Sequence, residues 1–158
     1  MKALIDTNVL LDVLNSRQPF YQDSKRIFDL VRENKLEGYI SIQSLKDIFY
    51  YFKKLGKNPF GVIEQLTFIF PIIDVAGEDS ISALVSDIDD FEDGLLVFSA
   101  LRNGIEMIIT RNEKDFFESD LVVISPNEID KYLSNNIKTG SITIDNVFDT
   151  VVMKNVHM

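Results

Sequence analysis

Short apolar segments alternate with amphipathic segments along the chain, and this alternation constrains the fold more than any other feature. The apolar segments have the length of strands, and the longest amphipathic segment repeats apolar side chains every three or four residues, which is typical of a helix. We predict strands over 2–6, 38–41, 70–75, 106–110 and 121–125. We predict helices over 8–15, 21–33, 44–56, from 59 onward, through 81–88 and over 91–104. This order predicts an α/β fold, a parallel sheet with helices on both faces.

The composition excludes several classes of protein. A chain of 158 residues with 46% hydrophobic residues can form one domain with a sizeable core. It has no cysteine, which excludes disulfides, thiolate zinc sites and a cysteine nucleophile, and its one histidine, His157, stands next to the end. No signal peptide and no apolar run of about 18 residues is evident, so we expect a cytoplasmic protein without a membrane segment.

The domain organisation is simple at this level. We predict one domain over 1–134, because the polar residues 134–136 follow the last α/β segment. Residues 135–158 then form a tail whose role the sequence does not indicate. No internal repeat or low-complexity segment interrupts the chain.

Several acidic side chains are predicted to meet at one edge of the sheet. Ligands of open parallel sheets bind beyond the carboxyl ends of the strands, at the point where the strand order reverses. Asp6 ends the first strand, and Asn112 and Asp115 follow the fourth. Asp47, in the helix after the second strand, and Asp93, in the first turn of the helix before the fourth, can join them.

Each of these acids also has an ordinary structural interpretation. Asp6 is well placed to cap the helix that follows it, and Asp93 to face a helix dipole. Asp47 could pair with a neighbouring lysine such as Lys46, and Asp115 could be a loop acid. Aspartate is a poor residue for a helix interior, which makes Asp47 the hardest to explain by structure alone. Their joint placement favours a shared site.

The net charge of −9 is unusual for a protein that binds nucleic acid, but its distribution is uneven. Residues 58–101 contain no lysine or arginine and nine acids. Basic residues gather on either side of this segment, and we consider them candidates for contacts with a nucleic-acid backbone, although each alone is more simply a surface charge: Lys46, Lys53, Lys54, Lys57, Arg102, Arg111 and Lys114.

The sequence resembles the PIN-domain proteins, in particular the VapC-type toxin ribonucleases of prokaryotes. The resemblance covers residues 1 to about 133 and depends on four segments in combination: IDTNVLLDVL, ISIQSLKDIFYYFKK, DFEDGLLVFSALRNGIEMIITRNEKDF and ISPNEI. It implies a three-layer α/β/α fold with a five-stranded parallel sheet in the order 3-2-1-4-5. It further implies a Mg²⁺- or Mn²⁺-dependent endoribonuclease that leaves 5′-phosphate and 3′-hydroxyl ends, is held inactive by an antitoxin protein, and forms a homodimer.

The family's site residues carry over one at a time. The first acid falls on Asp6, the second on Asp47 and the third on Asp93. The fourth position falls on Asn112, with Asp115 close behind. The resemblance therefore implies Asp6, Asp47, Asp93 and Asp115 as catalytic residues, with Asp6, Asp93 and Asp115 on the metal. It implies that Thr110 matches the family's small hydroxyl residue at the end of the fourth strand and, with Asn112, supports the cofactor.

Two departures from the family keep an alternative open. Asp47 is one methylene shorter than the usual glutamate, so it would reach a metal through water, and Asn112 carries no charge. A catalytically weak PIN domain that binds RNA or a protein is therefore the alternative to an active enzyme. A haloacid-dehalogenase-like phosphatase is disfavoured, because it requires a second aspartate at the position of Asn8. The sequence does not name the RNA target.

Overall fold

A computed structural model describes residues 1–137 of the chain. The contacts divide the chain into two units, Met1–Pro126 and Asn127–Met158, and each is described by itself. The second unit is helical over 129–137, and the remainder of the predicted 135–158 tail lies outside the described residues. The boundary that we predict at residue 134 stays a prediction.

The first unit is a parallel sheet of five strands in the order β3-β2-β1-β4-β5, which confirms the predicted architecture. The strands are β1 (Lys2–Ile5), β2 (Glu37–Ser41), β3 (Ile72–Ile73), β4 (Met107–Ile109) and β5 (Val122–Ile124). The helices are α1 (Thr7–Leu14), α2 (Tyr21–Arg32), α3 (Ile42–Lys54), α4 (Pro59–Ile69), α5 (Gly77–Val85) and α6 (Phe91–Arg102), with short 3₁₀ turns η1 (Glu113–Phe116) and η2 (Pro126–Glu128).

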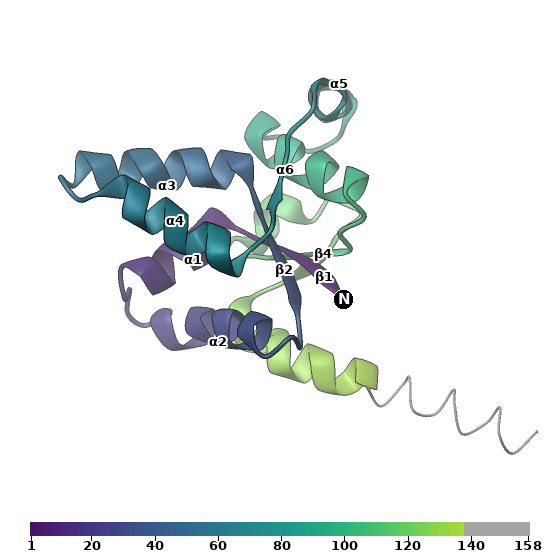
Figure 1. Ribbon diagram of the computed structural model, residues 1–158. Helices are drawn as coiled ribbons and strands as arrows, with labels where there is room; N and C mark the ends of the chain where they lie inside the picture. Colours follow the sequence, from purple (N-terminus) through teal and green to yellow (C-terminus); the bar gives the residue numbers. More distant parts are fainter. Residues whose placement is uncertain (138–158) are drawn as a thin grey trace, which may run out of the picture. The chain divides into compact units, whose positions relative to one another are not determined.

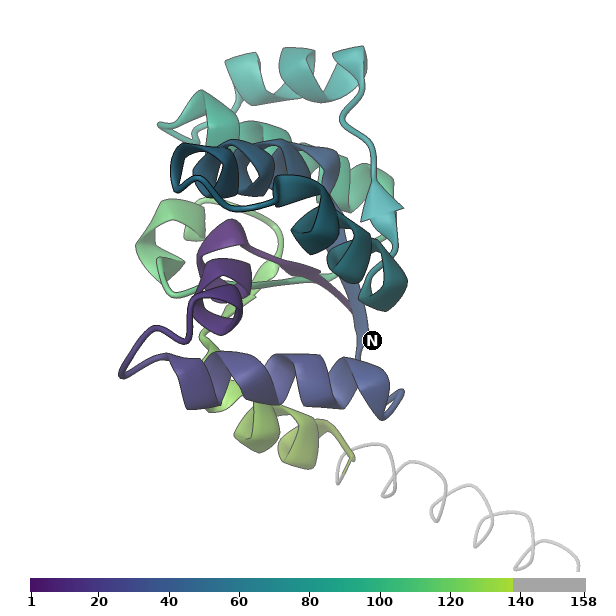
Figure 2. The same ribbon diagram turned by 60° about the vertical axis from the view of Figure 1, so that its left-hand side comes forward.

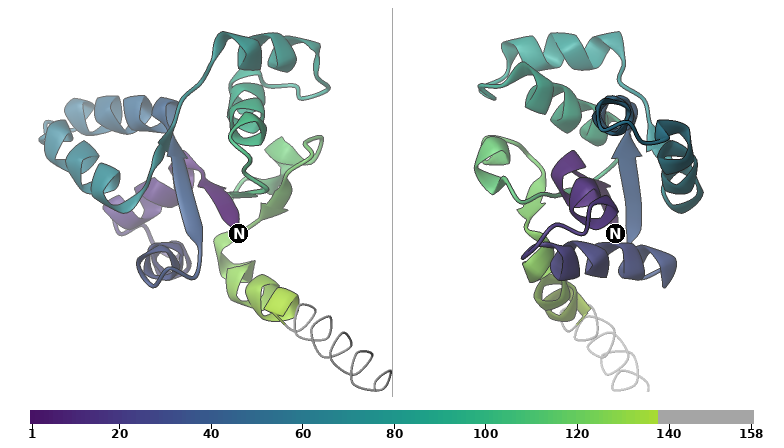
Figure 3. Two further views of the ribbon diagram at one scale, coloured as in Figure 1. Left: turned by 45° about the vertical axis from the view of Figure 1, so that its right-hand side comes forward. Right: turned by 90° about the vertical axis from the view of Figure 1, so that its left-hand side faces the viewer.

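The helices cover the sheet on both faces. Helices α1 to α4 lie on one face, and α5 and α6 on the other (Figures 1 and 3). Helices α3 and α4 run side by side, as Figure 2 also shows. On the second face, β1 and β4 contribute Leu4 and Ile108 to a core with Val97 of α6 and Phe116 of η1, all at most 1% exposed. Parallel sheets need cover on both faces, which is why these strands are almost entirely apolar.

The centre of the sheet is held in register by its buried middle strand. Ile5 of β1 lies opposite Ile109 of β4, and the Asp6 amide donates to the Ile109 carbonyl at 3.0 Å. The Thr110 amide donates to the Ile124 carbonyl of β5, also at 3.0 Å. Asp6 and Thr110 therefore leave the sheet at the same edge, the carboxyl edge of its strands.

The predicted strands and helices of the first unit are present, and among them β3 and α5 differ most in extent from the prediction. Strand β3 is shorter than the predicted 70–75 and comprises Ile72–Ile73 only, since Pro71 has no amide hydrogen to donate. Helix α5 begins four residues before the predicted 81–88 and ends at Val85. It begins early because the Asp79 carboxylate accepts a hydrogen bond from the Ala76 amide at 2.7 Å, which satisfies the first turn.

Helix α6 packs unusually closely on α5. A Cβ at Gly94 would lie 2.9 Å from the Cβ of Ala83, so only glycine fits at this position. Because Gly94 follows Asp93 directly, this contact also sets where the first turn of α6 lies. Helix α6 ends as predicted, with Gly104 in the left-handed conformation at φ 68°.

No helix among the described residues is long and apolar enough to cross a membrane. The cytoplasmic location that we expect stays a prediction.

Candidate active site

Asp6 is held rigidly at the carboxyl edge of the sheet. Its Oδ1 accepts from the Thr7 amide at 2.7 Å, which caps α1. Its Oδ2 accepts from the Asn8 side-chain amide at 2.8 Å and from the buried Thr110 hydroxyl at 2.7 Å. Asp6 is therefore a helix cap, as the structural interpretation predicts. It also lines a pocket, and its part in a shared site stays a prediction.

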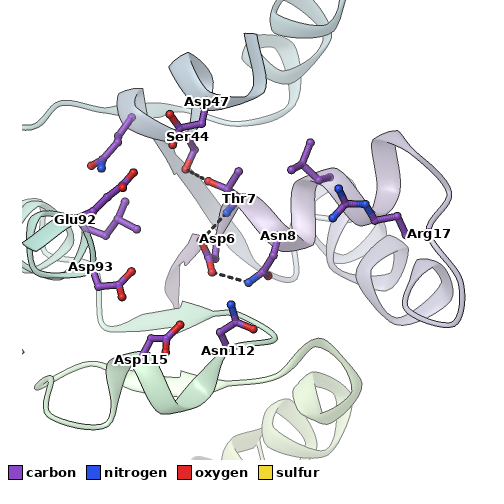
Figure 4. Close-up of a pocket in the computed structure, with 13 residues that line it drawn as sticks. Asp6, Thr7, Asn8, Arg17, Ser44, Asp47, Glu92, Asp93, Asn112 and Asp115 are labelled. Carbon is purple, nitrogen blue, oxygen red and sulfur yellow. Dashed lines mark hydrogen bonds between the residues drawn. The ribbon is translucent and has the colours of Figure 1, made fainter. Parts of the chain in front are cut away.

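The pocket beside Asp6 has a volume of about 310 Å³ and opens at the carboxyl edge of the sheet (Figure 4). Its lining comes from α1, α3, α6 and the segment after β4, elements far apart in the sequence. The lining residues are Asp6, Thr7, Asn8, Leu11, Arg17, Gln43, Ser44, Asp47, Glu92, Asp93, Leu96, Asn112 and Asp115. All the catalytic and metal residues predicted from the sequence lie in this one pocket, and their roles stay predictions.

Asp93 reaches the pocket from the first turn of α6. The cap of this helix is Asp90, whose Oδ1 accepts from the amides of Glu92 and Asp93 at 2.8 and 3.1 Å. Asp93 is therefore not the cap, and its carboxylate lies on the pocket side (Figure 4). Burial raises the pKa of Asp93 to about 6, with further contributions from the negative charges of Asp90, Asp115, Asp6 and Glu92.

The pKa of Asp6 is also raised. Burial is the largest cause, and the charge of Asp115 adds to it, whereas hydrogen bonds from Thr110 and Thr7 and the charge of Arg111 act in the opposite direction. Neighbouring carboxylates thus add to burial in disfavouring the ionisation of Asp6 and of Asp93. Such a cluster carries negative charge that its own protein surroundings do not neutralise.

Asp47 lies on the pocket side of α3 and is also paired at the surface. Its Oδ1 lies 3.4 Å from Nζ of Lys46, and its side chain is 39% exposed. In the same helix, Ser44 accepts a hydrogen bond from the Thr7 hydroxyl at 2.8 Å, which ties α3 to α1. Asp47 therefore pairs with Lys46, as its structural interpretation predicts, and also lines the acidic pocket, where its role stays a prediction.

The segment after β4 completes the pocket. The Asn112 amide donates to the Thr110 hydroxyl at 3.0 Å, and the Asp115 amide donates to the Asn112 carbonyl at 3.1 Å. Thr110 is fully buried beneath Asp6 and does not line the pocket itself. It acts by orienting Asp6 and the start of this segment.

Two charged lining residues were not identified from the sequence. Glu92 adjoins Asp93 in DFED, and this run of acids was a signal for it. Arg17 is the one basic side chain among the lining residues. Its Nη2 lies 3.4 Å from the Tyr51 hydroxyl, its guanidinium lies 5.7 Å from the centre of that ring, and its Nη1 lies 4.0 Å from Asp12. No sequence pattern marks Arg17, because only the turn after α1 brings it there.

Two of the basic residues considered for nucleic-acid contacts are engaged elsewhere. Arg102 binds the buried Asp79 through Nε and Nη2, at 3.0 and 2.9 Å. Arg111 binds the fully buried Asp12 at 2.6 and 3.1 Å, and its guanidinium lies 4.0 Å from the centre of the Phe20 ring. Guanidinium groups held in this way are poor ligands for a phosphate.

The donor set fits a divalent cation that keeps part of its water. Within residues 1–137, no three acidic or histidine side chains are arranged to hold an ion as they stand. The side-chain groups of the pocket that can bind a cation are nevertheless carboxylate, amide and hydroxyl oxygens, which are hard ligands suited to Mg²⁺ and Mn²⁺. Burial first and neighbouring carboxylates second raise the pKa of Asp6 and of Asp93, and a hydrated cation would offset the repulsion between these carboxylates.

Comparison with known proteins agrees with this geometry. Residues 2–114 match the model of the family described as PIN domain. The chain is 25% identical over 133 residues to Ribonuclease VapC1 of Aquifex aeolicus (strain VF5), over 80% of this chain and 92% of that protein.

Two solved structures share the fold. One is VapBC2 from Rickettsia felis bound to a DNA fragment from its promoter, with a TM-score of 0.61 at 18% identity, over 79% of this chain and 98% of that chain. The other is a toxin–antitoxin complex from Klebsiella pneumoniae, with a TM-score of 0.59 at 20% identity, over 78% and 97%.

Proposed function

The chain belongs to the PIN-domain family, and from that premise we propose that it is a Mg²⁺- or Mn²⁺-dependent endoribonuclease and the toxin of a toxin–antitoxin pair. One observation carries the proposal: Asp6, Asp93 and Asp115, from three distant segments, line one pocket, in which burial and neighbouring carboxylates raise the pKa of Asp6 and of Asp93. The likeness to a relative named as a ribonuclease and to toxin–antitoxin complexes supports it.

The residues have separate tasks in this proposal. Asp6, Asp93 and Asp115 hold the cation, and Asp47 contacts it through water because its side chain is short. Thr110 and Asn8 keep Asp6 in one orientation through their hydrogen bonds to its Oδ2. A bound divalent cation would make a nearby water more acidic and stabilise negative charge on the reacting phosphate.

The reaction is hydrolysis of a phosphodiester bond. A water molecule attacks the phosphorus, and the bond between the phosphorus and the 3′-oxygen breaks. The 3′-oxygen leaves as a hydroxyl group, and the phosphate stays on the 5′-oxygen of the next nucleotide. Arg17, the basic side chain in the lining, binds the phosphate that enters the pocket. Tyr51 keeps the guanidinium near the pocket.

A catalytically weak PIN domain that binds RNA or protein is the second candidate. The neutral Asn112 and the short, lysine-paired Asp47 favour it, because both reduce the negative charge available to a cation. The two candidates differ in one observable, namely metal-dependent cleavage of RNA.

An antitoxin and a second copy of the chain are the proposed protein partners. Helix α5 exposes three apolar side chains that a partner could cover: Ile81 (66%), Leu84 (73%) and Val85 (82%). Exposed apolar groups gathered in this way are typical of protein interfaces. A size measurement of the purified chain, alone and with a co-expressed antitoxin, tests this part of the proposal.

The decisive experiment is an RNA cleavage assay with purified protein. We expect single-stranded RNA to be cut in Mn²⁺ or Mg²⁺, the cutting to stop in EDTA and to return with excess Mn²⁺, and the products to carry 5′-phosphates. The variant Asp120→Asn, which alters an exposed acid outside the pocket lining, is the matched control and should cleave normally. Failure of the wild type to cleave any RNA in either metal would favour the second candidate.

A further inference from the structure

A second hollow lies directly beside the acidic pocket. It has a volume of about 450 Å³, within the usual range for ligand cavities, and is lined by Arg111, Asn112, Glu113, Lys114, Asp115 and Phe117. Asn112 and Asp115 line both hollows. The two hollows therefore adjoin at these two residues.

The aromatic ring in this hollow is exposed because of the geometry of η1. Neighbouring side chains on a 3₁₀ turn point about 120° apart. Phe116 points inward and is 1% exposed in the core, and Phe117 is consequently turned out and is 66% exposed. The Ser119 amide and hydroxyl both donate to the Phe116 carbonyl, at 3.0 and 2.7 Å, which fixes the end of the turn. The position of Phe117 is thus set by the fold, although its ring contributes little to the core.

The one basic side chain of the hollow that is not already engaged is Lys114. Arg111 is occupied by the buried Asp12 and by Phe20. Lys114 is exposed and has no ion-pair partner among the described residues. An ammonium group free to bind a phosphate therefore stands beside an exposed aromatic ring.

We propose that Lys114 and Phe117 form a nucleotide subsite: the base next to the cleaved phosphate stacks on Phe117, and Lys114 binds a backbone phosphate of the same strand. The subsite rests on the proposed nuclease function and deepens it. Stacking on an aromatic ring holds single-stranded nucleic acid with little regard to base identity, because every base has a π-face. Such a contact retains RNA on an acidic protein that has few free cations.

The lining favours a nucleotide over a protein segment. Five of the six lining side chains are polar or charged, and Phe117 is the one apolar group. A protein partner would more readily cover an apolar surface such as Ile81, Leu84 and Val85 of α5. A nucleotide offers a base that can stack on the Phe117 ring and a phosphate that can bind Lys114, and both side chains lie next to the proposed active site.

The test compares Phe117→Ala with Phe68→Ala, a control that removes an even more exposed ring (83%) from α4, outside both hollows. The substrate is a short single-stranded RNA whose cleavage site has been mapped. We expect Phe117→Ala to raise KM about 5- to 30-fold with little change in kcat, Phe117→Tyr to restore it, and Phe68→Ala to behave as the wild type. The substrate can also carry an abasic nucleotide on one side of the cleaved phosphate. With the abasic RNA that lacks the stacking base, the KM values of the wild type and of Phe117→Ala should be equal.

The phosphate contact is tested through salt. Lys114→Gln should weaken binding of a fluorescent RNA equally for all sequences and lower the slope of log affinity against log salt by about 0.7. Lys35→Gln, which alters an exposed lysine outside both hollows and outside the basic residues considered for nucleic-acid contacts, is the control and should leave the slope unchanged.

The outcomes separate this subsite from the nuclease itself. If the wild type cleaves RNA and Phe117→Ala matches it on every substrate, the subsite is wrong and the nuclease stands. If no RNA is cleaved, RNA binding measured by fluorescence anisotropy in Mn²⁺ still tests the subsite, because Phe117→Ala should then bind RNA more weakly than the wild type. Absence of binding, or a change in oligomeric size without a change in RNA affinity, would overturn the subsite.

Discussion

Two acidic clusters of this protein differ in how their charge is balanced. In the first, at the C-terminal end of α6, Asp79 is 2% exposed and is held by Nε and Nη2 of Arg102, which also reaches Asp74 at 3.1 Å. Burial alone would raise the pKa of Asp79, but hydrogen bonds from Arg102 and from the Ala76 amide more than offset it, so the pKa lies below its usual value.

In the second cluster, the acidic pocket, the same helix α6 supplies Asp93 with no such partner. Its pKa is raised to about 6 by burial and by four neighbouring acids. The fold therefore neutralises one group of carboxylates internally and leaves the other with excess charge. Removing one partner of an arginine–carboxylate pair destabilises the fold, whereas unpaired carboxylates at the carboxyl edge of the sheet are suited to bind a cation from solution.

We expect the largest effect on activity from a change at Asp6, in the acidic pocket. Asp6→Asn should reduce RNA cleavage by at least about 1,000-fold, equivalent to about 4 kcal/mol, because it removes one charge from the cation's ligands. The fold should survive, since the amide oxygen can replace Oδ1 as the acceptor for the Thr7 amide and so keep the cap of α1, although the bonds to Oδ2 are lost. Cleavage rates and circular dichroism measure the two effects. Unfolding of the variant together with an inactive wild type would leave Asp6 as a helix cap only.

The next effect is on stability and belongs to the arginine-paired cluster. Asp79→Asn should lower the free energy of unfolding by about 2–3 kcal/mol, less than for a fully buried pair because the Arg102 side chain is 26% exposed. The loss should be the same with EDTA and with Mn²⁺, as measured by denaturant titration. Asp74→Asn, whose side chain is 69% exposed, is the control and should cost less than about 1 kcal/mol. A loss that depends on Mn²⁺ would mean that both clusters bind the cation.

Asp93 and Asp115 should behave in the opposite way. Without metal, Asp93→Asn or Asp115→Asn should leave the melting temperature unchanged or raise it by up to about 4 °C, because each change relieves repulsion. With Mn²⁺, the stabilisation that the wild type gains by binding should shrink. Thermal melts in EDTA and in Mn²⁺ measure this. Equal destabilisation in both conditions would show that these acids serve their local helix and turn instead.

The pH dependence of stability should have opposite signs at the two clusters. The folded pKa of Asp93, about 6, lies above its unfolded value of 3.8, so in EDTA its contribution should destabilise the protein progressively as the pH rises from about 4 to about 6. The folded pKa of Asp79 is lowered, so its contribution is present above pH 3.8 and is lost as the pH falls below it. Stability curves of Asp93→Asn and Asp79→Asn, each subtracted from the wild type, reveal the two signs. Curves of the same sign would contradict the comparison.

The smallest effect is expected at Asp47. This residue resembles both clusters, because it is paired with a basic side chain, Lys46, and also lines the acidic pocket. Asp47→Glu should retain or raise activity, by no more than about fivefold or roughly 1 kcal/mol, because the longer side chain reaches further toward the cation. Asp47→Ala should weaken Mn²⁺ binding. Mn²⁺ titrations followed by cleavage rate measure both. Wild-type titrations from both variants would place Asp47 outside the cation site.

Local sequence patterns were sufficient for the strands and for the residues at their ends. Buried parallel strands are apolar throughout, so β1 and β4 could be found from composition alone, and the order of α/β units placed Asp6 and Asp115 at one edge. Helix caps are local as well, which is why the ends near Gly56 and Gly104 were predicted correctly. The extents of β3 and α5 were less predictable, because the first depends on Pro71 at a sheet edge and the second on the Asp79 carboxylate.

The pairing of charges required the tertiary structure. In the sequence, Arg102 and Arg111 are two basic residues near a run of acids, and nothing marks them as partners of Asp79 and Asp12, which lie 23 and 99 residues away. Arg17 enters the pocket only because Ser16, with φ 49°, turns the chain back after α1. Ion pairing depends on distances of a few ångströms between distant segments, and those distances exist only once the helices are packed on the sheet.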